Sequence, residues 1–497
     1  MKMKRVLSLI FAVLFLPLNM YASISPNEMG FRNAKTDIER YWVLYKTHER
    51  AIKSNQDVTY LGISDFTIEI PENAVSIPLP ARTNFGGVTI TVINNNKDNF
   101  FLFTLKKEFE RILIPQEIID KGTFTSVKKL SKGTKLLVIA DRMAWVQNRK
   151  GYDYGANRRD ILLLNNGVAD NTPVMPYGNI GISTPECYYT DADDEVKEIS
   201  NLHLIRSPKS TRITRLLRVE GLNNVRIENI SLSTPRIGRL YGDGAISIAD
   251  CVNVIFSNVI IDGTYSHKDK YGYGIVLNNV WNSTFNKLKG NANWGVFGNW
   301  NVNVCTLNEC DINRFDVHCY GKDILFKNCV LRDNYSQFSS VYGFVRYDDC
   351  SFIDYVPYLN EPSYNAYTPV TFIMNNCKMY IDNSNNEGII CRMCNSLDEE
   401  NNPRPELSKK TWPDVYINGL ELSSRKPLIG AYLFYVRNHS RQNTLIDGCR
   451  YVVIRNLRYN GNFKLSNRQV KLKEDMYYFV ELNEGISPLR GTSSVIK

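Results

Sequence analysis

The sequence predicts an all-β chain folded as a right-handed parallel β-helix, a solenoid, with a short N-terminal capping helix. The first observation is a phrase of apolar strand, asparagine-type corner and further apolar pair that recurs through residues 225–331. Its central residues are 29, 29, 22 and 19 positions apart, with no helical segment between them, which is typical of a β-solenoid. These central residues are Ile227, Phe256, Phe285, Leu307 and Phe326.

The second observation is a short strand ahead of each phrase, usually led by glycine or another small residue. Such strands begin at Gly244, Gly274, Gly295 and Asp316. Two or three strands in a turn of about twenty residues or more describe a right-handed parallel β-helix.

Residues 244–259 read GAISIADCVNVIFSNV, and this string resembles a coil of the pectate-lyase-like superfamily. The superfamily's loose coil pattern is a strand, a corner and then Asn-Val-x-Ile-x-Asn. The resemblance extends over roughly residues 199–457 and is specific for the fold rather than for a reaction. It implies a protein similar to the superfamily's polysaccharide lyases, hydrolases of the polygalacturonase type, esterases, epimerases or phage tailspikes, and most similar to the lyases. Function therefore has to be argued from the site.

Residues 1–22 have the pattern of a signal peptide. Lys2, Lys4 and Arg5 precede an apolar run over residues 6–18 that is too short for a good membrane span. We therefore expect export to the periplasm or the extracellular space. Loss of these three cationic residues takes the net charge from +9 to about +6. That charge suits an acidic polysaccharide or an anionic surface, and it is also ordinary for a chain of this length.

Behind the signal peptide we expect one continuous solenoid domain. Residues 23–190 are predicted to form the N-terminal cap and the first irregular turns, and residues 191–497 the main turns and a C-terminal cap. A helix over residues 36–55 is expected to plug the open end of the solenoid, with His48 as a surface or capping residue. One face of this helix carries Ile38, Trp42 and Tyr45.

Between residues 100 and 185 the repeats are less regular. Alternating segments at 135–140 and 161–164 are predicted to be strands of early, wide turns. The stretch between them is expected either to line a sugar-binding cleft or to be a solvated loop. It collects the aromatic and basic residues Trp145, Arg149, Lys150, Tyr152, Tyr154, Arg158 and Arg159.

Eleven cysteines in an exported chain raise the question of disulfides. Cys310, Cys329 and Cys377 each follow a central apolar residue by three positions, so we expect them to stack as an internal ladder of buried thiols. Cys391 and Cys394 form a Cys-x-x-Cys pair with no second pair or histidine near it in sequence. We interpret them as a structural pair or as two buried thiols, and we predict no metal site.

The outward side chains follow from an alignment of the turns on their central residues, with one residue lost in the corner after Tyr320. Alternation then directs His318 and Tyr320 to the same outward face, roughly 7 Å apart along the strand. A one-residue error would bury His318 instead. In this alignment Ile246, Ile275, Phe297 and Val317 share one inward position, and Ile248, Leu277, Asn299 and Cys319 share the next.

This outward face suits β-elimination from a uronic-acid glycan. The proton at C5 becomes acidic when the neighbouring carboxylate is neutralised, a base then removes it, and an acid protonates the leaving oxygen. We predict His318 as the base, because histidine titrates near neutrality, and Tyr320 or a tyrosine of the 271–273 loop as the acid. The candidate catalytic residues are His318, Tyr320, His267, Lys270, Tyr271 and Arg314. The candidate substrate-binding residues are Asn291, Asn293, Trp294, Trp300, Tyr273 and Arg346.

No cofactor is predicted, because Asn291 or Asn293, with Arg314 or Lys270, is expected to hold the substrate carboxylate. A divalent cation such as calcium is the alternative neutraliser. The expected partner is an acidic polysaccharide, and the surplus of cationic groups over carboxylates in residues 265–347 favours a chondroitin or hyaluronan type over pectin. We expect a monomer, with no stable membrane insertion and no binding of nucleic acid, since no basic stripe or binding motif occurs.

Two other functions remain open. Hydrolysis needs two positioned carboxylates, for which Asp243, Asp316 and Asp348 are the candidates, although the motif strings of polygalacturonase-type enzymes are missing. A non-catalytic glycan-binding solenoid explains the aromatic and basic surface equally well. In that case His318 is a hydrogen-bonded structural residue and Trp300 packs a loop.

Overall fold

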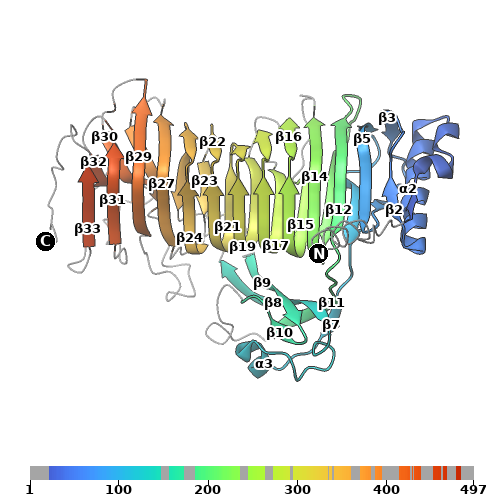
Figure 1. Cartoon of the computed structure of the whole chain (residues 1–497), viewed down its shortest axis with the longest axis horizontal. Coiled ribbons are helices and arrows are strands. Elements are labelled where there is room, and N and C mark those ends of the chain that lie inside the picture. The colour runs from blue at the N-terminus through green and yellow to red at the C-terminus, as the bar shows by residue number, and fades with distance from the viewer. Residues whose placement is uncertain are drawn as a thin grey trace, which may run out of the picture.

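The chain forms a parallel β-helix whose strands stack along one long axis, with a small lobe on one side (Figure 1). The structure is a computed structural model. It describes residues 22–146, 156–172, 185–234, 244–263, 273–291, 295–333, 335–338, 341–359, 370–381, 387–394, 413–425, 428, 430–437, 451–459, 463–466 and 477–482. Within these ranges no helix is both long and apolar enough to cross a membrane.

Each turn of the β-helix contributes strands to three faces, and many strands bend at a corner to serve two of them. In β15 the segment from Ile246 pairs with β13, whereas the segment from Val252 pairs with β14. The bent strands are β5 (Arg82–Ile93), β12 (Lys197–Arg206), β14 (Asn223–Thr234), β15 (Ile246–Ser257), β17 (Tyr273–Asn286), β19 (Gly295–Asn308), β21 (Phe315–Lys327), β27 (Val370–Ile381), β29 (Asp414–Ser424) and β31 (Tyr451–Arg458).

The remaining solenoid strands belong to one face each. We call the faces first, second and third in the order in which a turn visits them. The first face adds β4 (Ile77–Pro78), β6 (Phe100–Lys106), β13 (Thr214–Glu220), β23 (Tyr335–Phe338), β26 (Val356–Leu359), β28 (Glu387–Cys394), β30 (Gly430–Arg437) and β32 (Phe463–Ser466). The second adds β1 (Ser23–Ile24), β2 (Asp57–Thr59), β24 (Val341–Asp348) and β33 (Tyr477–Leu482). The third adds β3 (Phe66–Glu69), β16 (Ile260–Gly263), β18 (Lys289–Asn291), β20 (Asp311–Ile312), β22 (Val330–Arg332) and β25 (Ser351–Ile353).

The predicted central residues fill the interior of the β-helix in register. Ile227 pairs with Phe256, Phe256 with Phe285, Phe285 with Leu307, and Leu307 with Phe326. All five are fully buried, and the Phe256 and Phe285 rings stack at 4.8 Å between centroids. The prediction of a parallel β-helix from this phrase is therefore confirmed.

Asparagine stands at the corners because the chain turns there with positive φ. Asn201, Asn229 and Asn258 have φ of 60°, 53° and 55°, in the left-handed region that asparagine tolerates better than most residues. Their side-chain amides also bond from turn to turn, with N–O distances of 3.0 and 3.1 Å. The corner residue thus supplies both the bend and a hydrogen bond between adjacent turns.

The predicted cysteine ladder is present and longer than expected. Cys310, Cys329 and Cys377 are buried free thiols, as predicted, and Cys350 stands between the last two. Its turn was missed because the central residue there is Tyr347, which is fully buried, rather than an aliphatic residue or phenylalanine. Cys391 is likewise buried and free, whereas the side chain of Cys394 lies outside the described residues.

The N-terminal cap is the helix α2 (Asp37–Ser54), preceded by two short 3-10 helices, η1 (Pro26–Met29) and η2 (Phe31–Asn33). Thr36 caps α2 through a reciprocal pair of bonds with Glu39, and the helix covers the first strands of the stack (Figure 1). Of the two alternatives predicted for His48, the surface position is wrong, because its side chain is fully buried; it is a capping residue whose Nε2 lies 2.8 Å from the hydroxyl of Tyr60. The most buried face of the helix carries Tyr41, Leu44, Thr47, His48 and Ala51, while Ile38 is exposed.

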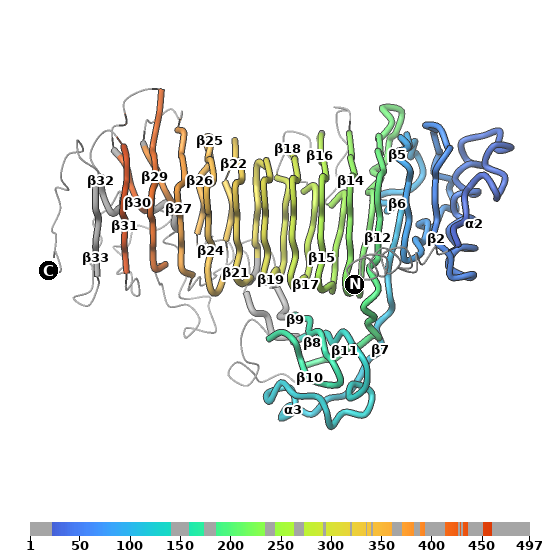
Figure 2. The backbone as a smooth tube through the Cα atoms, in the orientation of Figure 1, coloured from blue at the N-terminus to red at the C-terminus, as the bar shows by residue number. Residues whose placement is uncertain are grey.

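The small lobe is an insertion between β6 and β12, and it corrects the predicted early turns. Residues 135–140 and 161–164 pair antiparallel with each other in a separate five-stranded sheet, not with solenoid strands. Alternating apolar residues indicate a strand but do not identify its pairing partner. The sequence pattern therefore could not assign these strands to a separate sheet. The insert contains β7 (Glu110–Ile112), α3 (Gln116–Lys121), β8 (Thr134–Val146), β9 (Ala156–Asn165), β10 (Val168–Ala169) and β11 (Glu186–Asp191). The backbone trace shows this sheet beside the middle of the stack (Figure 2).

Candidate functional site

The first face presents its functional side chains where β17, β19 and β21 begin. Phe297 pairs with Phe315 and Asn299 with Val317, so the predicted pairing of Phe297 with Val317 is wrong by two residues. The register then shifts by one residue at His318, and Trp300 pairs with Cys319. Up to Val317 the error is two residues, which leaves the side chains on their predicted faces because alternation has a period of two; from Cys319 on it is one residue. His318 therefore keeps its outward orientation, although neighbouring side chains cover most of it.

Four side chains converge at this point, and we call them the face-one cluster: Tyr273, Arg314, Asp316 and His318. The Tyr273 hydroxyl lies 2.7 Å from Asp316 Oδ2 and 2.8 Å from His318 Nε2. Arg314 Nε donates to the same Oδ2 over 2.6 Å, and the backbone N–H of Gln337 donates to Oδ1 over 2.9 Å. The cluster thus unites Tyr273 of β17 with Asp316 and His318 of β21, two strands away, and with Arg314, which directly precedes β21.

Two glycines make this arrangement possible. Tyr273 is paired with Gly295 across the sheet, yet its ring extends over Gly298 of β19 to reach β21. A Cβ on Gly298 would lie 2.3 Å from Cδ2 of that ring, and a Cβ on Gly295 would lie 2.6 Å from Cβ of Arg314. Side chains at either position would occupy the space of the cluster.

The charges of the cluster are balanced inside the protein. Arg314 is 1% exposed and Asp316 is fully buried, so each compensates the other. Burial lowers the pKa of Arg314, but the Asp316 carboxylate, through its charge and its hydrogen bond, together with Tyr273 and Tyr335, outweighs burial and raises the pKa of the guanidinium overall. Its planar group also lies over the Tyr335 ring, 4.3 Å from the centroid. Arg314 therefore holds Asp316 and does not reach outward.

The edge of the cluster reaches the surface beside Trp300. His318 and Tyr273 are 7% and 8% exposed, whereas Trp300 is 37% exposed. The His318 ring contacts both aromatic rings, with centroids 5.5 Å from Tyr273 and 5.6 Å from Trp300. An exposed indole next to a buried tyrosine–histidine pair is an arrangement that can hold a sugar ring against acid–base groups.

The other predicted site residues have different outcomes. Asn291 is exposed at the end of β18, and its Oδ1 accepts a hydrogen bond from Asn313 Nδ2 over 3.4 Å. Asn313 directly precedes Arg314, so this bond links Asn291 to the edge of the cluster. Arg346 is not brought to the cluster, because it pairs with Leu325 on the second face and forms an ion pair with Asp348 at 2.8 Å. Five candidates lie outside the described residues, as does the side chain of Tyr320; the five are His267, Lys270, Tyr271, Asn293 and Trp294.

The sequence interpretation missed the central position of Asp316. It treated this residue only as a carboxylate for hydrolysis. The spacing Arg314-x-Asp316-x-His318 puts polar residues at three alternate positions where β21 begins, and this alternation was a usable signal. Gln337 and Tyr335 had no such signal, because their roles depend on how β23 stacks on β21.

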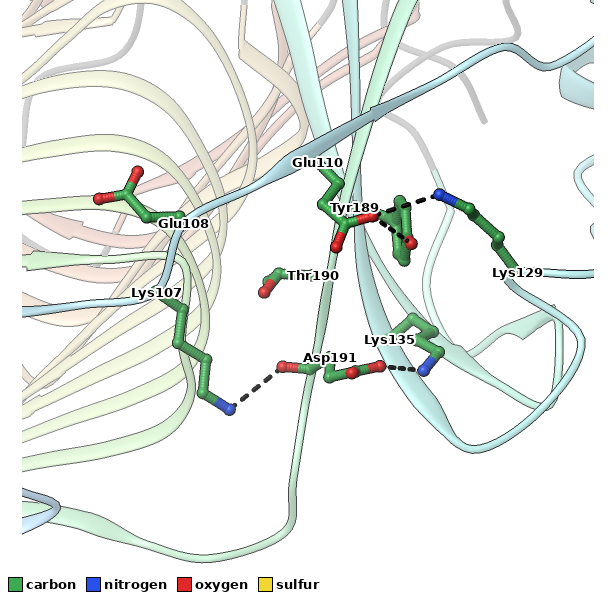
Figure 3. A pocket seen from close by; sticks show the side chains of 8 residues that line it. All are labelled: Lys107, Glu108, Glu110, Lys129, Lys135, Tyr189, Thr190 and Asp191. Atoms are coloured by element: carbon green, nitrogen blue, oxygen red, sulfur yellow. Dashed lines mark hydrogen bonds and ion pairs between the residues drawn. The ribbon is translucent and has the colours of Figure 1, made fainter. Parts of the chain in front are cut away.

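A pocket of about 230 Å³ lies at the base of the insert (Figure 3). Its charged side chains are paired with each other or with a neighbouring residue, as Lys107 is with Asp193 and Glu108 with Lys106. Lys129 and the Tyr189 hydroxyl both bond Glu110 Oε2, at 3.3 and 2.7 Å, while Lys135 bonds Asp191. No residue of the cluster lines this pocket. Its lining is Lys107, Glu108, Glu110, Lys129, Lys135, Tyr189, Thr190 and Asp191.

Within the described ranges there is no group of three or more His, Cys, Asp or Glu side chains that can hold a metal ion. Asp243, one of the carboxylates considered for hydrolysis, lies outside these ranges.

No family model matches the chain, and no curated protein matches it in sequence. In structure it is similar to the tailspike protein gp49 of Pseudomonas phage LKA1, with a TM-score of 0.52 and 11% identity over 93% of this chain and 78% of that one. Two other tailspikes give TM-scores of 0.49. They are gp61 of Pseudomonas phage phi297, at 12% identity over 91% and 83% of the chains, and gp54 of Acinetobacter baumannii bacteriophage AP22, in complex with capsular saccharide, at 10% over 92% and 79%. The fold is therefore a parallel β-helix that resembles a phage tailspike protein.

Proposed function

We propose that this chain is an exported polysaccharide lyase that binds a uronic-acid-containing glycan on the first face and cleaves it by β-elimination. The observation that carries the proposal is the position of the Tyr273 hydroxyl, between His318 Nε2 and Asp316 Oδ2. A hydroxyl and an imidazole that share one hydrogen bond can exchange a proton, which is what an acid–base pair requires.

The proton positions follow from the hydrogen-bond inventory. Asp316, paired with Arg314, is the acceptor of the Tyr273 proton. Tyr273 has a single proton, so His318 Nε2 has to donate to the tyrosine oxygen. This tautomer, assigned from the network, puts the imidazole lone pair on Nδ1.

The elimination then proceeds by a short proton relay. Nδ1 of His318 takes the proton from C5 while the bond from C4 to the glycosidic oxygen breaks. The Tyr273 hydroxyl turns from Asp316 and gives its proton to the leaving oxygen. The resulting phenolate receives the Nε2 proton of His318. Exchange of the remaining imidazole proton with solvent restores the starting tautomer.

Trp300 supplies the stacking face for a sugar ring in this proposal. We assign the neutralisation of the substrate carboxylate to Asn293 or Lys270, or to a divalent cation such as calcium, because Arg314 is already paired with Asp316. The net charge of about +6 after loss of the leader supports an acidic glycan, and we propose a chondroitin or hyaluronan type over pectin.

A non-catalytic glycan-binding surface is the second candidate. The observation that favours it is that Tyr273, Asp316 and Arg314 satisfy one another inside the protein, as groups in a purely structural network do. Hydrolysis is less well supported, because Asp316 accepts three hydrogen bonds and Asp348 is paired with Arg346.

The test uses the mature protein and a panel of uronic polysaccharides, with and without chelator. The readouts are the ultraviolet absorbance of the unsaturated uronate, new reducing ends, and binding to immobilised glycan. We expect absorbance to rise with one substrate and to fall by about a hundredfold or more in Tyr273→Phe and His318→Asn. Tyr60→Phe is the matched control, because it breaks a tyrosine–histidine bond of the same length in the cap.

Two outcomes contradict the lyase, and a third contradicts the assigned catalytic residues. Reducing ends without absorbance indicate hydrolysis, binding without either product indicates a glycan-binding solenoid, and full activity in both cluster variants moves the chemistry elsewhere. An absorbance rise that disappears when chelator is added shows that a metal ion neutralises the substrate carboxylate.

A further inference from the structure

The insert is attached to the β-helix through a chain of polar side chains at the corner between the first and second faces. Arg159 of β9 binds Asp250 with two bonds, Nε to Oδ1 at 2.8 Å and a terminal nitrogen to Oδ2 at 2.6 Å. Asp250 is 4% exposed, whereas the Arg159 side chain is 37% exposed, so the carboxylate is shielded from water and the guanidinium covers it from the insert side. Within the stretch 145–159 that was expected to line a cleft or to be solvated, Arg159 is therefore a docking residue.

The polar chain continues across three successive turns. Asn279 donates to Asp250 Oδ1 over 2.6 Å, and Asn301 donates to Asn279 Oδ1 over 2.6 Å. The Asn301 amide also donates to the backbone carbonyl of Arg159, which returns the chain to the insert. We call Arg159, Asp250, Asn279 and Asn301 the corner latch. Its three solenoid members all have positive φ, between 50° and 58°, so each sits at a bend of the backbone.

Apolar packing supports the same docking independently. Val252 of the solenoid is fully buried against one side of the insert sheet, and Trp281 packs beside it. The insert contributes Leu136, Val138, Ile161 and Leu163. The polar latch and this apolar contact fix the insert on the corner.

The latch ends one residue from the surface of the site. Asn301 follows Trp300 directly, and the Trp300 ring lies against His318. Because Asn301 sits in the left-handed region, its side-chain bonds help to hold the bend that orients the preceding residue. We propose that Arg159 is a positioning residue, which acts through Asp250, Asn279 and Asn301 to hold Trp300 in its substrate-binding orientation. This proposal rests on the function proposed above for Trp300.

The test compares Arg159→Met, which keeps the length of the side chain and removes its charge, with Arg159→Lys and with a control in the same insert. The control is Arg111→Met, because Arg111 forms an exposed ion pair with Glu186 at 3.3 Å and has no role in the latch. Each variant is made with and without Trp300→Phe. The difference in acrylamide quenching of tryptophan fluorescence between a variant with Trp300 and the same variant carrying Trp300→Phe measures how accessible Trp300 is. This measurement needs no substrate.

We expect Arg159→Met to raise the Trp300 quenching constant by about twofold, since local loosening exposes the indole more often. On the substrate found in the lyase assay, KM is expected to rise about tenfold with kcat changed less than about threefold, as for loss of substrate positioning. Arg159→Lys should fall between wild type and Arg159→Met, and Arg111→Met should match wild type.

Unchanged quenching in Arg159→Met overturns the proposal, as does an equal change in Arg111→Met. If Arg159→Met fails to fold, Asp250→Asn replaces it, because it keeps the shape of the latch and removes the charge; the same increase in quenching is then required. Absence of any lyase activity in the wild type counts against the proposed function alone, since the quenching comparison still decides the role of Arg159.

Discussion

The substitution Gly298→Ala tests the site most directly, because it adds one carbon between two strands of the face-one cluster. The new Cβ would lie 2.3 Å from Cδ2 of Tyr273, and 2.6 Å from both Cγ and Cε2. Ordinary contact begins near 3.4 Å, so the ring has to move by about 1.1 Å. The Tyr273 hydroxyl then leaves the range of its bonds to Asp316 and His318, which are 2.7 and 2.8 Å long.

Both stability and activity should respond. We expect the free energy of unfolding to fall by about 1–3 kcal/mol from overpacking, measured by urea denaturation. The lyase rate should fall about a hundredfold, as for a misplacement of about 1 Å at a reacting group. The matched control is Gly388→Ala, a strand glycine whose Cβ would meet its nearest neighbour at 3.3 Å.

A double-mutant cycle separates the clash from a general intolerance of β19. In the Tyr273→Ala background the ring is gone, so Gly298→Ala should cost at least about 1 kcal/mol less than it costs alone. Additive effects of the two substitutions would refute the position of the ring over Gly298, and with it the geometry of the cluster.

Two further predictions concern buried charge and pH. Asp316→Asn leaves the Arg314 guanidinium buried without its carboxylate, so the free energy of unfolding in urea should fall by about 3–5 kcal/mol, and adding Arg314→Met should recover most of that loss; an equal loss in the single and double variants contradicts the buried pair. Burial lowers the pKa of His48 to about 3 from an ordinary value of 6.5, so between those values the unfolded chain binds a proton that the folded chain does not. The free energy of unfolding should therefore fall as the pH drops through this window, by up to about 1.4 kcal/mol per pH unit. His48→Gln should remove this pH dependence of the free energy of unfolding. The control His203→Gln changes an exposed histidine and should leave the pH dependence unchanged. A pH profile unchanged by His48→Gln contradicts the burial of a neutral imidazole.

The fold was predictable because its signals are local and repeated. Phe256 and Phe285 stand at equivalent points of successive phrases, and Asn229 and Asn258 mark the same corner. The insert was not predictable in this way, because an alternating strand such as β8 looks the same whether its partner is parallel or antiparallel.

The candidate site was predictable only in part. The outward orientation of His318 survived a register error, because the error was two residues and not one. Its partners were harder to find: Tyr273 reaches the cluster only because Gly298 has no side chain, and Gln337 arrives from the next turn through its backbone. Contacts of this kind depend on the stacking of turns, which a linear pattern does not specify.

The way the insert joins the β-helix has an evolutionary consequence. Its two stems come together where Lys107 Nζ lies 2.8 Å from Asp193 Oδ2, and on either side of them the solenoid continues in register, with β6 paired to β13 and β5 to β12. A module with adjacent stems can be lengthened, exchanged or lost without changing the pitch of the scaffold that carries it. Evolution can therefore change the residues near Trp300 by exchanging this insert, while the strands that hold Tyr273 and His318 stay the same.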